Sequence, residues 1–197
     1  MDMDGYSHTM RWIEELFAAI LQLKPPDTVL TDKSLPYKPQ DFKFLDSQAS
    51  STEGTSVEDV VSSLLRFAKT DLQKVRAVWT WMATHIVYDY ENHTEDPQEV
   101  FKRRKAMCGG HAKLFQEMCR IAGVPCEYIL GSCPEKAKSR HAWNAVSIGS
   151  QWHLVDVTWS RRDYYFLTRP EEFCKTHTPD DSRWNLLDRK SSTATAA

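Results

Sequence analysis

Residues 108–131 read CGGHAKLFQEMCRIAGVPCEYILG, and the apolar pattern changes its period within this stretch. The apolar residues of the first half recur at helical spacing and form one face: Leu114, Phe115, Met118, Ile121 and Ala122. Gly123 is a typical residue at the end of a helix, and Pro125 follows it closely. After Pro125 the period falls from about 3.6 residues to about 2. The stretch therefore predicts a helix that begins at Cys108 and a strand over 125–131.

The segments on either side continue this division. Upstream, helical spacing predicts a helix after Ser56, a second helix from Asp71 and a short third segment that ends in the basic run 102–105. Downstream, alternating residues predict further strands, over 141–148, 151–159 and 164–167. Helices followed by antiparallel strands are typical of an α+β domain. We therefore expect an α+β fold.

The composition is that of an ordinary globular chain with one core. The 197 residues are 41% hydrophobic and 26% charged, and the formal net charge is −2. This balance favours neither nucleic acid nor an anionic membrane surface as a partner. No apolar run approaches the roughly 20 residues needed to cross a bilayer, and the acidic N-terminus lacks the pattern of a signal peptide. We expect an intracellular, cytoplasmic protein without nucleic-acid or membrane partners.

The number and spacing of the cysteines also fit an intracellular protein. They stand at positions 108, 119, 126, 133 and 174, an odd number without a paired framework. Because no C-x-x-C spacing is present, a structural zinc site is not expected. We expect reduced thiols, with Cys119 and Cys126 in the core, and neither a metal nor a cofactor.

The sequence predicts three parts. Residues 1–54 form an N-terminal extension that starts with a short helix over Tyr6–Leu23. Within it, residues 27–54 are rich in Ser, Thr, Asp, Pro and Lys, which fits either a linker or an ordered wrap. A compact domain is expected over 55–187, and a disordered tail over 188–197.

Cys108 stands where a helix lowers the pKa of a thiol. A thiol attacks as the thiolate, and the unpaired amide groups and dipole at a helix N-terminus favour that form. Gly109 and Gly110 leave the backbone near the sulfur uncrowded, so that a substrate carbonyl can approach. The amide groups of this turn, including Gly109, would bind an oxyanion. The alternative is a buried structural cysteine beside a flexible loop, and this segment alone favours neither.

The segments 141–148 and 151–157 predict a hairpin that joins a histidine to an aspartate. Only Gly-Ser at 149–150 separates them, which predicts a two-residue turn, with glycine first favouring type II′. That loop length makes His141 and Asp156 diagonal neighbours on one face of the sheet. A histidine held by an aspartate is the general-base arrangement that activates a thiol. The alternative is an ordinary strand histidine and a turn or capping acid.

Other histidines carry weaker signals. His111 lies one turn into the predicted Cys108 helix, where it would touch the site or be solvated. His153 falls on the strand face opposite Asp156, which predicts a surface or second-layer residue. His85 and Asp89 fit packing and capping better than ligand binding.

Tryptophans surround the proposed histidine and aspartate in the sequence. Trp143 and Trp159 would either exclude water from the site or belong to the core. Trp143 and Trp79 are also our candidates for a tryptophan that helps to bind the substrate or an oxyanion.

Four stretches resemble the transglutaminase-like superfamily, whose members are circularly rearranged relatives of papain. They are AVWTWMATHIVYDYE (77–91), AMCGGHAKLFQEMCRIAGVPCEYILG (106–131), HAWNAV (141–146) and QWHLVDVTWS (151–160). A fifth stretch, YYFLTRPEEFCKTHTPDDSRWNLL (164–187), resembles the segment after the core in one branch of the superfamily. That branch holds kyphoscoliosis peptidase, the LIM-and-transglutaminase-domain proteins and hillarin. The resemblance covers about residues 56–187.

The resemblance implies a papain-like, transglutaminase-core fold, in which the Cys108 helix packs against an antiparallel sheet. It also implies a catalytic triad of Cys108, His141 and Asp156. It also implies cytoplasmic, often cytoskeleton-linked roles, with cytoskeletal proteins among the expected protein substrates. The chemistry would be cysteine-dependent acyl transfer through a thioester, as peptide-bond hydrolysis, glutamine deamidation or transamidation. The residues do not separate these outcomes. Two other classes stay open: a non-catalytic protein-binding scaffold, and a structural domain with a buried histidine–aspartate pair.

Overall fold

The computed structural model describes residues 39–133, 140–159 and 163–187. The α-helices and 3-10 helices in this part of the chain are η1 (Pro39–Phe42), α2 (Lys43–Ser50), α3 (Val57–Leu64), α4 (Asp71–His85), α5 (Pro97–Arg103), α6 (Cys108–Ile121), η2 (Asp163–Tyr165), α7 (Pro170–Phe173) and η3 (Ser182–Asn185). The strands are β1 (Val87–Tyr88), β2 (Lys105–Ala106), β3 (Cys126–Ser132), β4 (Arg140–Ile148), β5 (Gln151–Val155), β6 (Phe166–Thr168) and β7 (Thr178–Pro179). The long helices precede the long strands, which confirms the α+β class.

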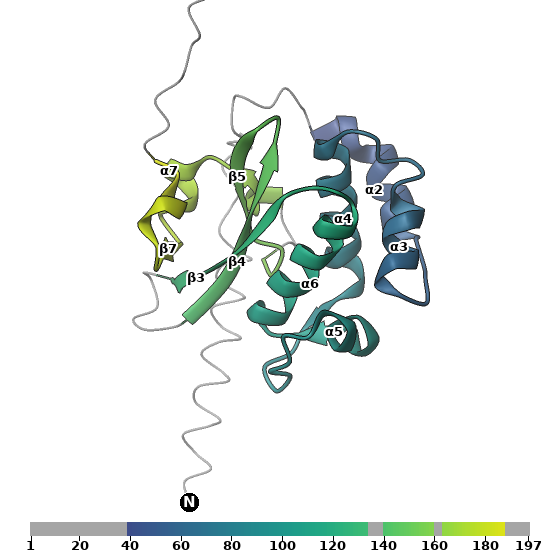
Figure 1. Ribbon diagram of the computed structural model, residues 1–197, viewed down its shortest axis with the longest axis horizontal. Helices are drawn as coiled ribbons and strands as arrows, with labels where there is room; N and C mark the ends of the chain where they lie inside the picture. Colours follow the sequence, from purple (N-terminus) through teal and green to yellow (C-terminus); the bar gives the residue numbers. More distant parts are fainter. Residues whose placement is uncertain (1–38, 134–139, 160–162, 188–197) are drawn as a thin grey trace, which may run out of the picture. The chain divides into compact units, whose positions relative to one another are not determined.

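Five strands form an antiparallel sheet in the order β6-β5-β4-β3-β7. The short strands β1 and β2 pair in parallel as a separate sheet. Figure 1 shows α2 to α6 on one side of the five-stranded sheet and α7 on the other. α6 contacts both β3 and β4, whereas α7 contacts β5. The predicted packing of the Cys108 helix against the sheet is therefore confirmed.

A buried asparagine ties α6 to the sheet. Asn144 of β4 has no exposed surface. Its Nδ2 donates to the carbonyl of Ala112 in α6 at 3.1 Å and to that of Glu127 in β3 at 3.2 Å. Both amide hydrogens are thus used, and one side chain links three elements. The link fixes α6 against the strand that also carries His141.

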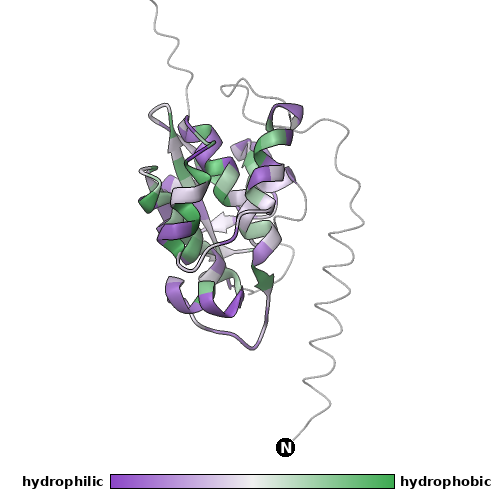
Figure 2. Ribbon diagram, turned by 90° about the vertical axis from the view of Figure 1, so that its right-hand side faces the viewer, coloured by the Kyte–Doolittle hydropathy of each residue, from purple (hydrophilic) through white to green (hydrophobic). Residues whose placement is uncertain are grey.

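The starts of two helices follow their capping signals. At α3, the Ser56 hydroxyl accepts a hydrogen bond from the Asp59 N–H at 3.1 Å. At α4, Thr70 and Gln73 form a capping box. Figure 2 shows hydrophobic and hydrophilic residues interleaved along the helices, as amphipathic helices require. The predictions that helices begin after Ser56 and at Asp71 are confirmed.

The hairpin between β4 and β5 has the predicted register and a different turn. Ile148 pairs with Gln151, which confirms the two-residue loop. Gly149 has φ 58° and Ser150 has φ 63°. Positive φ at both central residues defines a type I′ turn, whose twist matches that of the flanking strands. The type II′ prediction was wrong, but the register depends on loop length and is unchanged.

Residues before position 55 contribute to the core. α2 packs its apolar residues against α4. The indole N–H of Trp81 in α4 donates to the backbone carbonyl of Thr52 at 2.9 Å. Arg76 of α4 is buried and donates to both carboxylate oxygens of Asp46 in α2, at 2.8 and 2.7 Å. Of the two interpretations of residues 27–54, the described part, 39–54, fits the ordered wrap.

The predicted helix over Tyr6–Leu23 and the predicted tail over 188–197 lie outside the described residues. Among the residues that are described, no helix is both long enough and apolar enough to cross a bilayer.

Replacing Leu45 by alanine tests whether α2 belongs to the core. Leu45 is 6% exposed, whereas its neighbour Phe44 is 69% exposed. We expect Leu45→Ala to lower the free energy of unfolding by about 2–3 kcal/mol, through lost burial and a cavity. Phe44→Ala should change it by less than about 0.5 kcal/mol. Urea unfolding followed by circular dichroism measures both values, and equal effects would contradict the packing of α2.

Candidate active site

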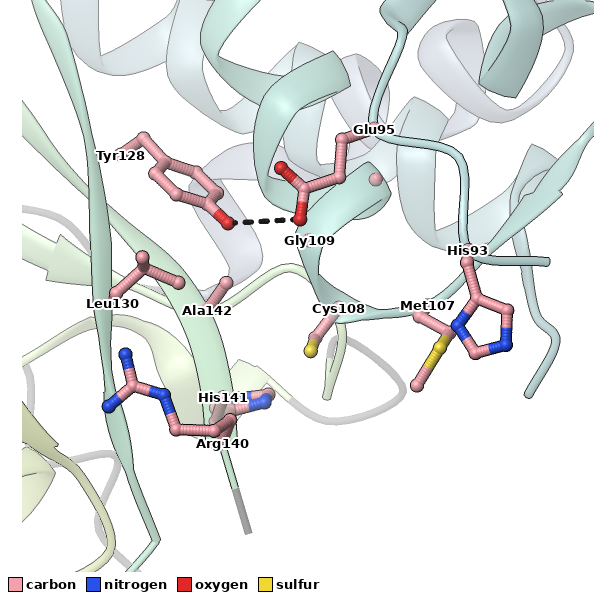
Figure 3. Close-up of a pocket in the computed structure, with 11 residues that line it drawn as sticks. His93, Glu95, Met107, Cys108, Gly109, Tyr128, Leu130, Arg140, His141 and Ala142 are labelled. Atoms are coloured by element: carbon pink, nitrogen blue, oxygen red, sulfur yellow. Dashed lines mark hydrogen bonds between the residues drawn. The ribbon is translucent and has the colours of Figure 1, made fainter. Parts of the chain in front are cut away.

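Cys108 is the first residue of α6 and lines a surface cleft of about 200 Å³. The other lining residues are His93, Glu95, Met107, Gly109, Gly110, Tyr128, Leu130, Arg140, His141 and Ala142. Figure 3 shows the thiol at the end of α6, with Leu130 and Tyr128 on the far side of the cleft. Cys108 is partly exposed, so a substrate can reach its sulfur from the surface.

His141 and Asp156 meet at one end of the β4–β5 hairpin. His141 Nε2 lies 2.8 Å from Asp156 Oδ2. The backbone N–H of Thr158 donates to the other carboxylate oxygen, Oδ1, at 2.8 Å. His141 also interacts with the Cys108 thiol, and both residues line the cleft. The structure thus brings together the three residues that the sequence singled out, in the order thiol, imidazole, carboxylate.

The protonation states of the three groups depend on one another. Burial raises the pKa of the Cys108 thiol, but the hydrogen bond and charge of His141 outweigh burial, so this pKa lies below its ordinary value. Burial lowers the pKa of His141, but the Asp156 carboxylate overrides this effect and raises the pKa to about 9. The pKa of Asp156 lies well below its usual range, because His141 outweighs the effect of burial. All three shifts favour the charged forms, which are thiolate, imidazolium and carboxylate.

A second histidine contacts the same carboxylate, and the sequence reasoning did not select it. His177 Nε2 lies 3.1 Å from Asp156 Oδ2, and the His177 side chain is fully buried. The residue lies between α7 and β7. No local pattern marks it, and its only signal in the sequence was the resemblance of 164–187 to a family segment. Its contact with Asp156 depends on tertiary structure.

Tyr88 is a further site residue that the sequence reasoning missed. β1 pairs with β2 in parallel, which places Tyr88 beside Ala106 and therefore near Cys108. The Tyr88 hydroxyl lies close enough to the backbone and the thiol of Cys108 for both to affect its pKa. Burial, with a smaller effect of the neighbouring Cys108, raises the pKa of this phenol and keeps it protonated. A protonated hydroxyl next to the nucleophile is a suitable donor to an oxyanion.

The tryptophans lie behind the site and do not line the cleft. Trp79 is 1% exposed and packs on Phe166, with 5.4 Å between ring centroids. Trp143 is equally buried, with its ring centroid 6.0 Å from that of His141. Trp159 stacks on His141 at 4.7 Å. Direct binding of substrate by Trp79 or Trp143 does not fit these positions, whereas Trp143 and Trp159 shield the imidazole from water.

Gly109 lines the cleft, and the nearest atom to a Cβ placed there would be Oε1 at the end of the exposed Glu95 side chain. A Cβ at Gly110 would instead lie 2.6 Å from the backbone oxygen of Thr94 and from the Cβ of Ala106. Gly110 therefore lets α6 pack closely against the preceding segment, rather than leaving space for a substrate. The Glu95 carboxylate accepts a hydrogen bond from the Tyr128 hydroxyl at 3.4 Å, shown in Figure 3.

His111, His85 and His153 do not line the cleft, whereas His93 does. His111 is buried rather than solvated, and its Nδ1 lies 3.0 Å from the Met107 carbonyl. His85 Nδ1 lies 2.9 Å from the Trp81 carbonyl, which confirms a packing role. His153 is buried in β5, so it is not a surface residue. All five cysteines are free thiols, and Cys119 is fully buried.

His141, Asp156 and His177 would also be a conceivable metal-binding set. Each offers one ligand atom, and these atoms lie within 4.8 Å of one another. Both Nε2 atoms, however, stand at hydrogen-bond distance from a single carboxylate oxygen. A metal ion would have to replace both hydrogen bonds and separate His141 from its carboxylate. The arrangement therefore fits proton-linked chemistry better than metal binding.

The fold and the site correspond to one protein class. A model of the transglutaminase-like superfamily matches residues 58–157. The chain belongs to this superfamily.

Its relatives define the branch. Mouse kyphoscoliosis peptidase is 37% identical over 185 residues, an alignment that covers 79% of this chain and 28% of the relative. Hillarin of Drosophila melanogaster is 24% identical over 169 residues, covering 66% of this chain and 21% of hillarin. A crystal structure of a TGase, at 19% identity and a TM-score of 0.43, covers 80% of this chain and 38% of that chain. The chain thus spans less than a third of the length of kyphoscoliosis peptidase and of hillarin.

The alkylation rate of Cys108 measures its thiolate fraction. Because His141 lowers the thiol pKa, we expect half-maximal reaction with iodoacetamide clearly below pH of about 8.5, the ordinary value for cysteine. In His141→Ala the midpoint should rise to that value or above. Mass spectrometry of the peptide that contains Cys108, over a pH series, gives the midpoint. His85→Gln, a distant packing change, is the control, and an unshifted midpoint in His141→Ala would contradict the coupling.

Proposed function

We propose that the protein catalyses cysteine-dependent acyl transfer on protein substrates. The observation that carries the proposal is the arrangement of three residues beside an accessible cleft: His141 is hydrogen-bonded to Asp156 and lowers the pKa of the Cys108 thiol. A thiolate stabilised by an imidazolium is a nucleophile at neutral pH. Membership of the transglutaminase-like superfamily supports the same chemistry.

In the proposed first half-reaction, the Cys108 thiolate attacks the carbonyl carbon of a peptide bond or a glutamine carboxamide. The His141 imidazolium gives its proton to the departing amine or ammonia, and a thioester remains on Cys108. In the second half-reaction, neutral His141 takes a proton from the attacking water or amine. The thioester then yields a carboxylic acid or a new amide, and the thiolate is regenerated. Asp156 orients the imidazole and stabilises its positive form throughout.

Two donors near Cys108 would stabilise the tetrahedral intermediate. One is the backbone N–H of Cys108, at the N-terminal end of α6. The other is the protonated hydroxyl of Tyr88, whose pKa is affected by the nearby Cys108 backbone. A substrate carbonyl oxygen that enters between them would accept from both, and fixed donors stabilise the developing negative charge without reorganisation.

Hydrolysis, deamidation and transamidation share the first half-reaction and differ in the leaving group and the acceptor. The cleft joins apolar side chains, Met107 and Leu130, to charged ones, Glu95 and Arg140, and such a lining suits a polypeptide segment. Free thiols throughout the chain fit a reducing compartment, so we propose that the protein works in the cytoplasm. Cytoskeletal substrates are proposed on the basis of the branch alone.

A product assay tests the proposed activity. A protein substrate is incubated with the enzyme, with and without a labelled primary amine, and new N-termini, released ammonia and incorporated amine are measured. We expect at least one of these products from the wild type, and its loss in Cys108→Ser and His141→Ala. Cys174→Ser, which changes a thiol outside the cleft, is the matched control. Turnover that persists in Cys108→Ser would contradict the proposal.

Tyr88→Phe separates oxyanion stabilisation from thiolate formation. We expect kcat for acyl transfer to fall by about 100–1,000-fold, the range found when one oxyanion donor is removed. Alkylation by iodoacetamide should change little, because that displacement forms no oxyanion. Tyr90→Phe is the control, since its ring packs against Tyr88 with 4.8 Å between centroids. If Tyr88→Phe slowed acyl transfer and alkylation equally, the role of the tyrosine would be structural alone.

A further inference from the structure

The Asp156 carboxylate is shared by two imidazoles. His141 Nε2 lies 2.8 Å from Oδ2, and His177 Nε2 lies 3.1 Å from the same oxygen. The Thr158 N–H donates a hydrogen bond to Asp156 Oδ1. A Cys–His–Asp mechanism accounts for His141 and Asp156 and assigns nothing to His177. A histidine that has no exposed side-chain surface and contacts a buried catalytic carboxylate therefore requires its own explanation.

His177 is enclosed by aromatic rings. The centroid distances from its ring are 4.0 Å to Phe173, 4.9 Å to Trp143, 4.8 Å to Trp159 and 5.3 Å to Tyr165. The titratable groups that face it are Asp156, His141 and Tyr165. Packing on several sides leaves the imidazole little freedom to rotate. The ring therefore holds its Nε2 at a fixed point beside Asp156.

The hydrogen-bond pattern defines the tautomer of His177. An ionised carboxylate only accepts hydrogen bonds, so the hydrogen must be on His177 Nε2. Nδ1 lies 2.9 Å from Thr176 Oγ1 and is available as an acceptor. Burial lowers the pKa of His177 to about 4, so the ring is neutral at physiological pH. A neutral donor stabilises the carboxylate without competing with the positive charge on His141.

We propose that His177 is a positioning residue. It holds the Asp156 carboxylate in the orientation in which the carboxylate binds His141 and keeps it protonated. Three donors, from His141, His177 and Thr158, fix the plane of the carboxylate. Without His177, His141 would be the only side chain hydrogen-bonded to Asp156 Oδ2. The carboxylate could then rotate, which would weaken its hydrogen bond to His141. The inference rests on the proposed function and adds a fourth residue to its machinery.

The segment that supplies His177 lies outside the superfamily match at residues 58–157. α7 packs on β5, and β7 pairs with β3 at Gly131 and Ser132, so the chain is anchored on both sides of His177. A Cβ at Gly131 would lie 2.2 Å from the Thr178 carbonyl oxygen, which shows how closely this segment approaches the sheet. The functional unit therefore extends through β7 and does not end after Asp156.

A pair of substitutions tests the role of His177. His177→Phe keeps a ring in the aromatic enclosure and removes the donor, whereas His177→Gln keeps an N–H that can reach Asp156. We expect His177→Phe to lower kcat by about 10–100-fold, as misplacement of a catalytic group does, with little change in KM. His177→Gln should restore most of the rate. Phe173→Leu, which disturbs the same packing without removing a polar group, controls for stability.

The pKa of His141, followed by NMR of its ring, gives a readout that needs no substrate. It should fall from about 9 in the wild type toward the ordinary value of about 6.5 in His177→Phe, and stay near the wild-type value in His177→Gln and Phe173→Leu. An unchanged or higher pKa in His177→Phe would overturn the inference. An ordinary pKa of the Cys108 thiol in the wild type would instead overturn the proposed function. The two failures are therefore distinguishable.

Discussion

The buried charge of Asp156 is the interaction on which the rest of the site depends. An ionised carboxylate without exposed surface is strongly unfavourable unless hydrogen bonds and an opposite charge compensate for the lost water. Here the compensation comes from His141, His177 and the Thr158 backbone. The carboxylate in turn keeps His141 protonated, and protonated His141 stabilises the Cys108 thiolate. The reactivity of the surface thiol is therefore set by a charge in the interior.

The fold assembles these groups from distant parts of the chain. Asn144 fastens α6 to the sheet, and α6 carries the thiol at its N-terminal end. The β4–β5 hairpin supplies the histidine and aspartate. The segment between α7 and β7 supplies His177, which packs with its aromatic neighbours next to Asp156. The helical layer orients the proposed nucleophile, and the sheet and the segment between α7 and β7 orient the proposed base.

Sequence reasoning was effective where the signal was local. Period and capping identified the major helices, and the two-residue loop fixed the register that places His141 beside Asp156. Tyr88 was missed because β1 has two residues, too few for a periodic pattern, and its position depends on pairing with β2. His177 was missed for a similar reason, since only the folded chain joins it to Asp156. Trp79 lies in the core and not in the lining of the cleft, a difference that a sequence does not show because buried and cleft-lining tryptophans look alike in it.

The most direct test of the account is whether Cys108 becomes acylated. An activated ester of a peptide acid, mixed rapidly with the protein, should release one equivalent of its chromophore in a burst. Intact-mass and peptide analysis should then find the acyl group on Cys108 in the wild type and only slow acylation in His141→Ala. Acylation spread over several cysteines, or equally fast on Cys108 without His141, would contradict a thiolate activated by the buried histidine–aspartate network.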